Sequence, residues 1–177
     1  MKKVTLCFAL LCTFFAQAQT TFGDFKLVEQ EIIYQKVFTA DSITVSKLSE
    51  YYKALPFVAN LSATGDEIQF EVNDIPVDYK KFQFAKAATP QIMQTGKFSG
   101  KVSVGVKDGR YRVTVQSIQL TGNIEYKMIN EKDNLTRYAT KNSATILSPD
   151  WCKPSMLGLL SQAFTDKLQF KKTGDDW

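Results

Sequence analysis

Apolar and polar residues alternate most regularly along residues 97–120, where the runs FSGKVSVGV and YRVTV flank the turn sequence KDGR. Alternation with a period of two is typical of a strand with one buried face. Asp108 and Gly109 favour a two-residue turn, because glycine adopts a positive φ without steric cost. The pattern predicts a hairpin that pairs Val106 with Tyr111, Val104 with Val113 and Val102 with Val115. After Ser117 the alternation slips by one residue, which indicates a β-bulge.

A second hairpin is predicted within FVANLSATGDEIQFEV, residues 57–72. A turn at Gly65 and Asp66 pairs Ala63 with Ile68, Leu61 with Phe70 and Ala59 with Val72, which places these apolar side chains on one face. Glu67 and Glu71 then point away from the core. A glycosidase needs two carboxylates across a cleft, and nothing marks a cleft here. We therefore interpret both glutamates as solvated strand positions.

Residues before the second hairpin predict one more strand and a first helix. QEIIYQKVF, residues 30–38, is rich in β-branched and aromatic residues and predicts a first strand after a polar lead-in at residues 19–28. Asp41 and Ser42 are suitable N-caps for a helix whose apolar residues recur at three- and four-residue spacing as far as Leu55.

The C-terminal third predicts a second helix. Pro154 suits a first helical turn, and the apolar residues that follow lie on one side of the helix up to about Phe170: Leu157, Leu160, Phe164 and Leu168. Residues 73–96 and 121–150 are expected to be surface excursions, although IEYKMI within the second could return as one more strand.

These elements predict an α+β domain over residues 19–177. The order β-α-β4-α gives an antiparallel sheet of four to six strands with two helices on one face. Helices on one side only would leave the opposite face of the sheet available for binding.

The first eighteen residues, MKKVTLCFALLCTFFAQA, have the pattern of a secretory signal peptide. A basic start precedes an apolar run of 13 residues, whereas a helix needs ~20 to cross a bilayer. We expect cleavage between Ala18 and Gln19 rather than a retained anchor. Leu11, which is not a small residue, precedes Cys12, so a lipoprotein signal is not favoured. The mature chain is expected to be exported, soluble, and periplasmic or extracellular.

Cleavage changes the charge and the cysteine count. The 22 basic residues of the full chain become 20 against 18 acidic ones, so the net charge falls from +4 to +2. A nearly neutral chain has no electrostatic footprint for nucleic acid. Only Cys152 would remain, which excludes an intramolecular disulfide.

The composition also limits the chemistry. The chain contains no histidine, which excludes Ser-His-Asp and Cys-His hydrolases and histidine metal sites. Cys152 precedes a predicted helix start, where a thiol pKa can fall, but a small side chain packed beside Trp151 is the better interpretation. No catalytic residue, cofactor or metal is expected.

The signal pattern, the β-α-β4-α order, the hairpin VSVGVKDGRYRVTV and the closing DDW together resemble a Bacteroidota family of exported domains of unknown function. That family is described as having a TBP-like fold, and the resemblance covers about Phe25 to Trp177. It implies an α+β architecture and supplies no catalytic or ligand residues. DNA binding does not follow from the fold name.

The open sheet face is the candidate binding surface. Arg112 points to it from across Gly105, Arg110 lies at the hairpin tip, and Tyr79 and Tyr126 could contribute. For KDGRYR itself, a solvated turn that keeps the strand ends soluble is the favoured interpretation, and the binding surface is its alternative. The leading hypothesis is a non-enzymatic domain that binds a protein, peptide or glycan of the cell envelope. A carrier of a small apolar ligand and, more remotely, an enzyme using Cys152 are the alternatives.

Overall fold

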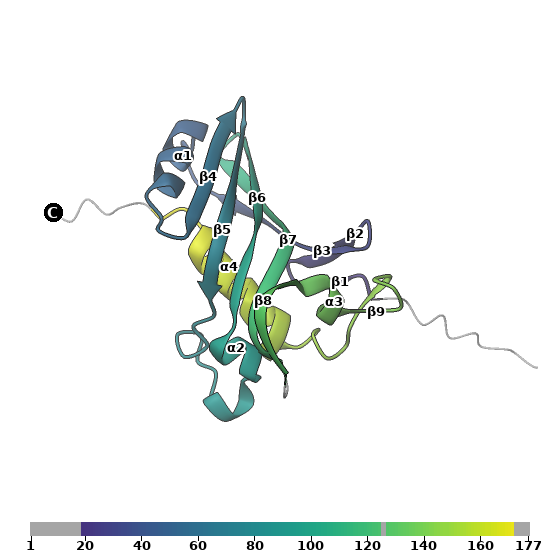
Figure 1. Ribbon diagram of the computed structural model, residues 1–177. Coiled ribbons are helices and arrows are strands. Elements are labelled where there is room, and N and C mark those ends of the chain that lie inside the picture. Colours follow the sequence, from purple (N-terminus) through teal and green to yellow (C-terminus); the bar gives the residue numbers. More distant parts are fainter. Residues whose placement is uncertain (1–18, 125–126, 172–177) are drawn as a thin grey trace, which may run out of the picture.

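The computed structural model describes residues 19–124 and 127–171 and contains one large antiparallel sheet of eight strands (Figure 1). Seven strands follow the order β1-β2-β3-β7-β6-β5-β4, and β8 pairs with β7 beside β3. The bounds are β1 Thr21–Phe22, β2 Phe25–Val28, β3 Glu31–Thr39, β4 Val58–Thr64, β5 Glu67–Pro76, β6 Lys97–Lys107, β7 Arg110–Ile124 and β8 Lys127–Asn134. The α+β class is as predicted, but the expected count of four to six strands is too low.

The additional strands come partly from the N-terminus, where residues 19–28 were expected to be a lead-in. This segment instead forms β1 and β2, which extend the sheet beyond β3. Phe25 is the physical reason, since its ring is buried against Tyr34 at 5.6 Å between centroids. Phe22 and Leu27 also pack against the core, so the segment contributes apolar contacts that hold β1 and β2 on the sheet.

The central hairpin has the predicted register. Val106 pairs with Tyr111, Val104 with Val113 and Val102 with Val115. The predicted slip is also present, because Ser117 has a φ of 50° and the β6–β7 register shifts between Ser99 and Lys101.

The β4–β5 hairpin matches its prediction only near the turn. Ala63 pairs with Ile68 as predicted, but Val72 pairs with Val58 rather than Ala59. The register shifts between Ala59 and Ser62, where Asn60 has a φ of 54°. A bulge in this edge strand adds one residue and thereby changes the pairing beyond it.

Within residues 19–124 and 127–171, four α-helices accompany the sheet, rather than the two predicted: α1 Val45–Lys53, α2 Gln91–Thr95, α3 Leu135–Ala139 and α4 Leu159–Leu168. A single π-helical turn, η2 Pro154–Gly158, leads into α4, and a 3-10 turn, η1 Lys86–Ala88, precedes α2. Thr44, rather than Asp41 or Ser42, caps α1, since its side chain accepts a hydrogen bond from the Lys47 N–H.

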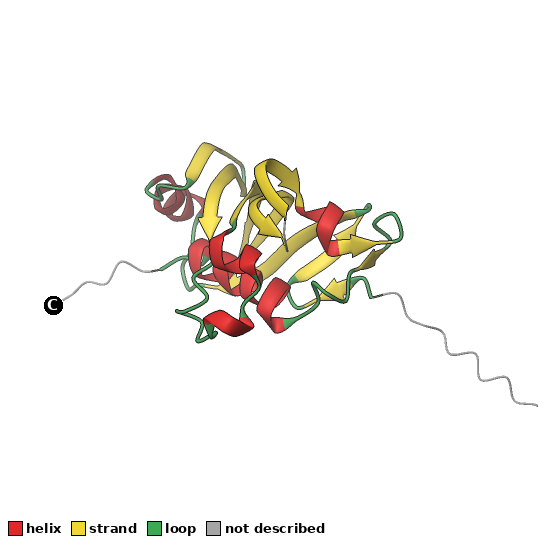
Figure 2. Ribbon diagram, turned by 60° about the horizontal axis from the view of Figure 1, so that its bottom comes forward, coloured by secondary structure: helices red, strands yellow, loops and turns green. Residues whose placement is uncertain are grey.

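The core lies between one face of the sheet and the helices α1 and α4 (Figure 2). Tyr34, Val115, Val102 and Phe70 form a cross-strand row on that face. Phe164 of α4 packs on Tyr34 at 5.3 Å, and Tyr52 of α1 packs on Phe70 at 4.7 Å. The two long helices therefore cover the same side, as predicted.

The expected surface excursions contribute to sheet and core. In 121–150, β8 pairs with β7, α3 buries Leu135 and Ala139, and Thr140–Lys141 (β9) pairs with Ile146–Leu147 (β10). In 73–96, β5 continues to Pro76 and α2 buries Ile92 and Met93. The excursion prediction is corrected accordingly, because these stretches carry apolar residues that the core buries.

Tyrosine hydroxyl groups hold the C-terminal end of α4. Tyr52 donates to the Leu168 carbonyl at 2.7 Å, and Tyr51 donates to the Gln169 carbonyl at 3.0 Å. The Tyr111 hydroxyl accepts the Phe170 N–H at 2.6 Å. The last carbonyls of a helix lack intrahelical partners, so these contacts satisfy groups that would otherwise need water.

The β7 backbone between its pairing with β3 and its pairing with β8 is bonded by one side chain, that of Glu31. β3 pairs with β7 as far as Val115, and β8 begins to pair at Gln119. Between them the Ser117 N–H donates to the Glu31 carboxylate at 2.6 Å.

We expect Glu31→Ala to lower the free energy of unfolding by about 1–3 kcal/mol, because it leaves a half-buried N–H without its partner. Urea unfolding measures the loss, and faster hydrogen exchange at Ser117 would localise it. Glu29→Ala, two residues away in an exposed turn, is the matched control and should change little. Equal losses in both variants would contradict this role for Glu31.

Candidate binding site on the open face of the sheet

The face of the sheet opposite α1 and α4 carries mostly polar side chains. We call it the open face and define it by residues of the five strands β3, β7, β6, β5 and β4: Gln35, Val37, Arg112, Thr114, Gln116, Lys101, Ser103, Gly105, Glu67, Gln69 and Ser62. All are exposed or half-buried. Strand residues alternate between faces, so the neighbours of the residues buried under the helices point to the open face.

A hollow of about 360 Å³ lies at the hairpin end of this face. We call it the hairpin hollow. Its lining residues are Val37, Asp66, Gly105, Val106, Lys107, Arg110, Tyr111 and Arg112. Within it the register places Arg112 between Val37 of β3 and Gly105 of β6. Both predicted arginines are therefore brought together at one site.

The cations of the hairpin hollow form no ion pair within the described part of the chain, although Asp66 also lines the hollow. Among the residues that the structure describes, neither Arg110, Arg112 nor Lys107 takes part in an ion pair. Val37 is 56% exposed. Among the described residues, only Val28 and Met128 are other large hydrophobic side chains with comparable exposure. Unpaired guanidinium groups beside an exposed apolar side chain suit a ligand with both an anionic and an apolar part.

A second hollow, of about 490 Å³, continues along the same face toward β4. Its lining is polar and includes Ser62, Gln69, Lys101, Ser103 and Gln116. Glu67 and Glu71 also line it, so both lie on the face predicted for them. The open face thus changes from basic at the hairpin tip to mixed charge beside β5.

Two predicted residues do not join the arginines. Tyr79 is half-buried and packs against the core. Its loop lies beside α4, since Lys81 forms an ion pair with Asp166 at 2.7 Å. The structure therefore places Tyr79 on the helix side of the sheet. Tyr126 lies outside the described residues, as do residues 1–18 with Ala18 of the predicted cleavage site.

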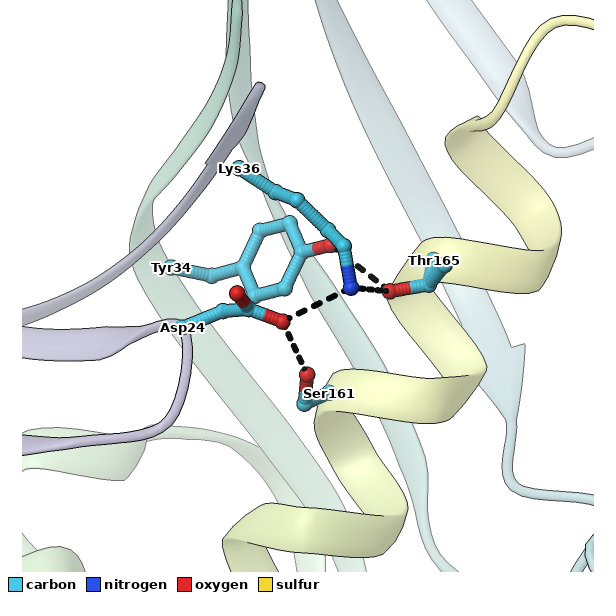
Figure 3. Close-up of polar contacts among 5 residues, drawn as sticks. All are labelled: Asp24, Tyr34, Lys36, Ser161 and Thr165. Carbon is cyan, nitrogen blue, oxygen red and sulfur yellow. Dashed lines mark hydrogen bonds and ion pairs between the residues drawn. The ribbon is translucent and has the colours of Figure 1, made fainter. Parts of the chain in front are cut away.

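A polar cluster on the helix side ties α4 to the N-terminal strands (Figure 3). Lys36 of β3 forms an ion pair with Asp24 at 3.0 Å and donates to the Thr165 hydroxyl at 3.1 Å. Ser161 donates to the same Asp24 oxygen at 2.6 Å, and the Tyr34 and Thr165 hydroxyls are 3.0 Å apart. Each member has a partner within the cluster, so we interpret it as a structural link and not as a reactive site.

Cys152 shows no sign of activation. Burial raises the pKa of its thiol, whereas a nucleophilic cysteine needs a lowered pKa. The side chain is half-buried and packs against the core, and the neighbouring Trp151 is 5% exposed. Within the described ranges, no group of three or more acidic or cysteine side chains is placed to hold a metal ion. The same residues include no helix that is long and apolar enough to cross a membrane.

The fold and site define an α+β domain with a helix-covered and a polar sheet face. No family model and no curated protein matches the chain. Among solved structures it is similar to a DUF4468 family protein from Bacteroides ovatus ATCC 8483, with 15% identity, a TM-score of 0.41 and coverage of 81% of this chain and 82% of that one.

It is also similar to a TBP-like protein from Parabacteroides distasonis ATCC 8503, with 10% identity, a TM-score of 0.43 and coverage of 79% and 88%. Both names agree with the family resemblance stated from the sequence. Neither match assigns a site residue or a ligand to this chain.

Proposed function

We propose that this protein is an exported, non-enzymatic domain of the cell envelope, and that its open face binds a polypeptide partner. The observation that carries the proposal is the one-sided sheet. Both long helices cover one face, and the other presents the hairpin hollow and its polar extension. Export rests on the signal pattern of the first eighteen residues.

The absence of histidine and the raised pKa of Cys152 support a non-enzymatic role. A carrier of a small apolar ligand would need an internal pocket of a few hundred Å³. The hairpin hollow and its extension instead open on the exposed face and include charged residues. The geometry favours binding at a surface over enclosure of a ligand.

Site-specific photo-cross-linking in intact cells tests the proposal. A photoreactive amino acid at Ser103, on the open face, should give adducts with a polypeptide partner. The same amino acid at Lys47, exposed on α1, should give none. Arg112→Glu should reduce the Ser103 adducts, and Lys47→Glu is the matched charge reversal. Adducts of equal yield from both positions, or none from Ser103, would reject a partner on the open face.

A further inference from the structure

Two glycines in β6 stand there for different reasons. A Cβ at Gly100 would lie 2.8 Å from Val115 Cγ1 and 3.1 Å from the Gln116 carbonyl oxygen, so the fold itself requires a glycine. A Cβ at Gly105 would meet nothing within 4 Å, and its φ is not in the positive range. Glycine within a strand costs about 0.5–1 kcal/mol relative to alanine. Packing does not explain Gly105, whereas close approach of a ligand would.

The surroundings of Gly105 define what could approach it. Arg112 of β7 pairs directly with Gly105, and Lys107 and Arg110 form the next pair on this face toward the turn. On the other side Gly105 pairs with Glu67, and Asp66 lines the hollow. Asp66 lines the hollow with the three cations, and Glu67 adjoins it from the second hollow, so the cations around Gly105 outnumber the carboxylates by one. That balance matches a single negative charge better than a doubly charged phosphate.

We propose that the hairpin hollow binds a carboxylate group of the partner polypeptide, which deepens the proposed function and rests on it. Arg112 and Arg110 donate to the carboxylate, because the guanidinium fork matches its two oxygens. Gly105 leaves the space that the group occupies, and exposed Val37 contacts the apolar part of the same ligand.

A peptide titration followed by NMR tests this assignment. The probe is the capped peptide acetyl-Ala-Leu-Glu-Ala-amide, and its glutamine counterpart removes only the charge. Addition of the glutamate peptide to the ¹⁵N-labelled chain should shift the Gly105 amide and the arginine Nε–H signals. The glutamine peptide should bind at least tenfold more weakly. Equal binding of both peptides, or tighter binding of inorganic phosphate, would overturn the carboxylate assignment.

Two variants give the test its specificity. Arg112→Gln should weaken binding of the glutamate peptide at least tenfold, whereas Lys47→Gln, exposed on α1 and away from the open face, should change its affinity less than twofold. Gly105→Leu should also abolish binding while the thermal midpoint stays constant or rises, because its side chain enters open space. Unchanged affinity in Arg112→Gln or in a folded Gly105→Leu would reject the site.

The cross-linking result separates the two proposals. Loss of peptide selectivity with Ser103 adducts retained would reject the carboxylate site alone. Absence of adducts from Ser103 would reject the proposed function as well.

Discussion

Phe164→Ala is expected to lower the free energy of unfolding by about 3–5 kcal/mol, the range for removal of a fully buried aromatic ring. Phe164 is completely buried and joins α4 to two strands. Its ring lies 5.3 Å from Tyr34 and 6.3 Å from Phe25 between centroids. Alanine would leave a cavity at the point where the helix meets the N-terminal end of the sheet.

Urea unfolding followed by circular dichroism measures this loss. Phe170→Ala is the control, since this ring is half-buried just beyond α4 and contacts Tyr51 at 5.1 Å. It should cost less than half as much, because less apolar surface returns to water. Equal losses would show that α4 is not held mainly by its buried face.

A sharp loss of stability above pH 10 is the second large effect that we expect. Burial, the main cause, raises the pKa of Tyr111 to about 12, and it raises the pKa values of Tyr34 and Tyr52 still further above the usual value near 10. The folded state therefore keeps these phenols neutral where the unfolded chain ionises them. Their contribution is complete below pH 10 and is lost as the pH rises toward the folded pKa values.

The size of this effect follows from the linkage relation. At about pH 11, roughly one unit above the pKa of an unfolded tyrosine, each of the three costs about 1 kcal/mol, so together they remove a few kcal/mol. Absorbance at 295 nm reports phenolate, and it should rise for these tyrosines together with the loss of secondary structure. Tyr111→Phe removes one titrating group and should make the pH dependence shallower. Ionisation of all tyrosines in a still-folded chain would contradict the expectation.

The sequence predicts the central hairpin well because its information is local. The alternation around Asp108 and Gly109 determines both the turn and the register. The bulge at Asn60 gives no comparable signal, since its cause is the positive φ of a non-glycine residue in an edge strand. The strand role of residues 19–28 depends on burial of Phe25 by residues far away in the chain, which no local pattern contains.

The residues of the candidate site also differ in how far local sequence predicts them. Strand parity alone placed Arg112 opposite Gly105, and the structure has that pair. Val37 joins them only because β3 pairs with β7, a contact between segments distant in sequence. Tyr79 is expected on the open face from the sequence, whereas in the structure its loop lies beside α4. Non-local pairing, and not side-chain chemistry, decides which residues share the site.

The long strand β7 also constrains the order in which the chain folds. β6 and β8 adjoin it in sequence, but β3 pairs with it across about 80 residues, which carries a large loop-closure cost. We infer that the β6–β7 hairpin forms early and that β1, β2 and β3 join late. If the chain is exported as proposed, its N-terminal end emerges first, and the edge of β3 stays unpaired until residues 110–115 follow. An unpaired strand edge can pair with another chain, so this interval is the one in which aggregation competes with folding.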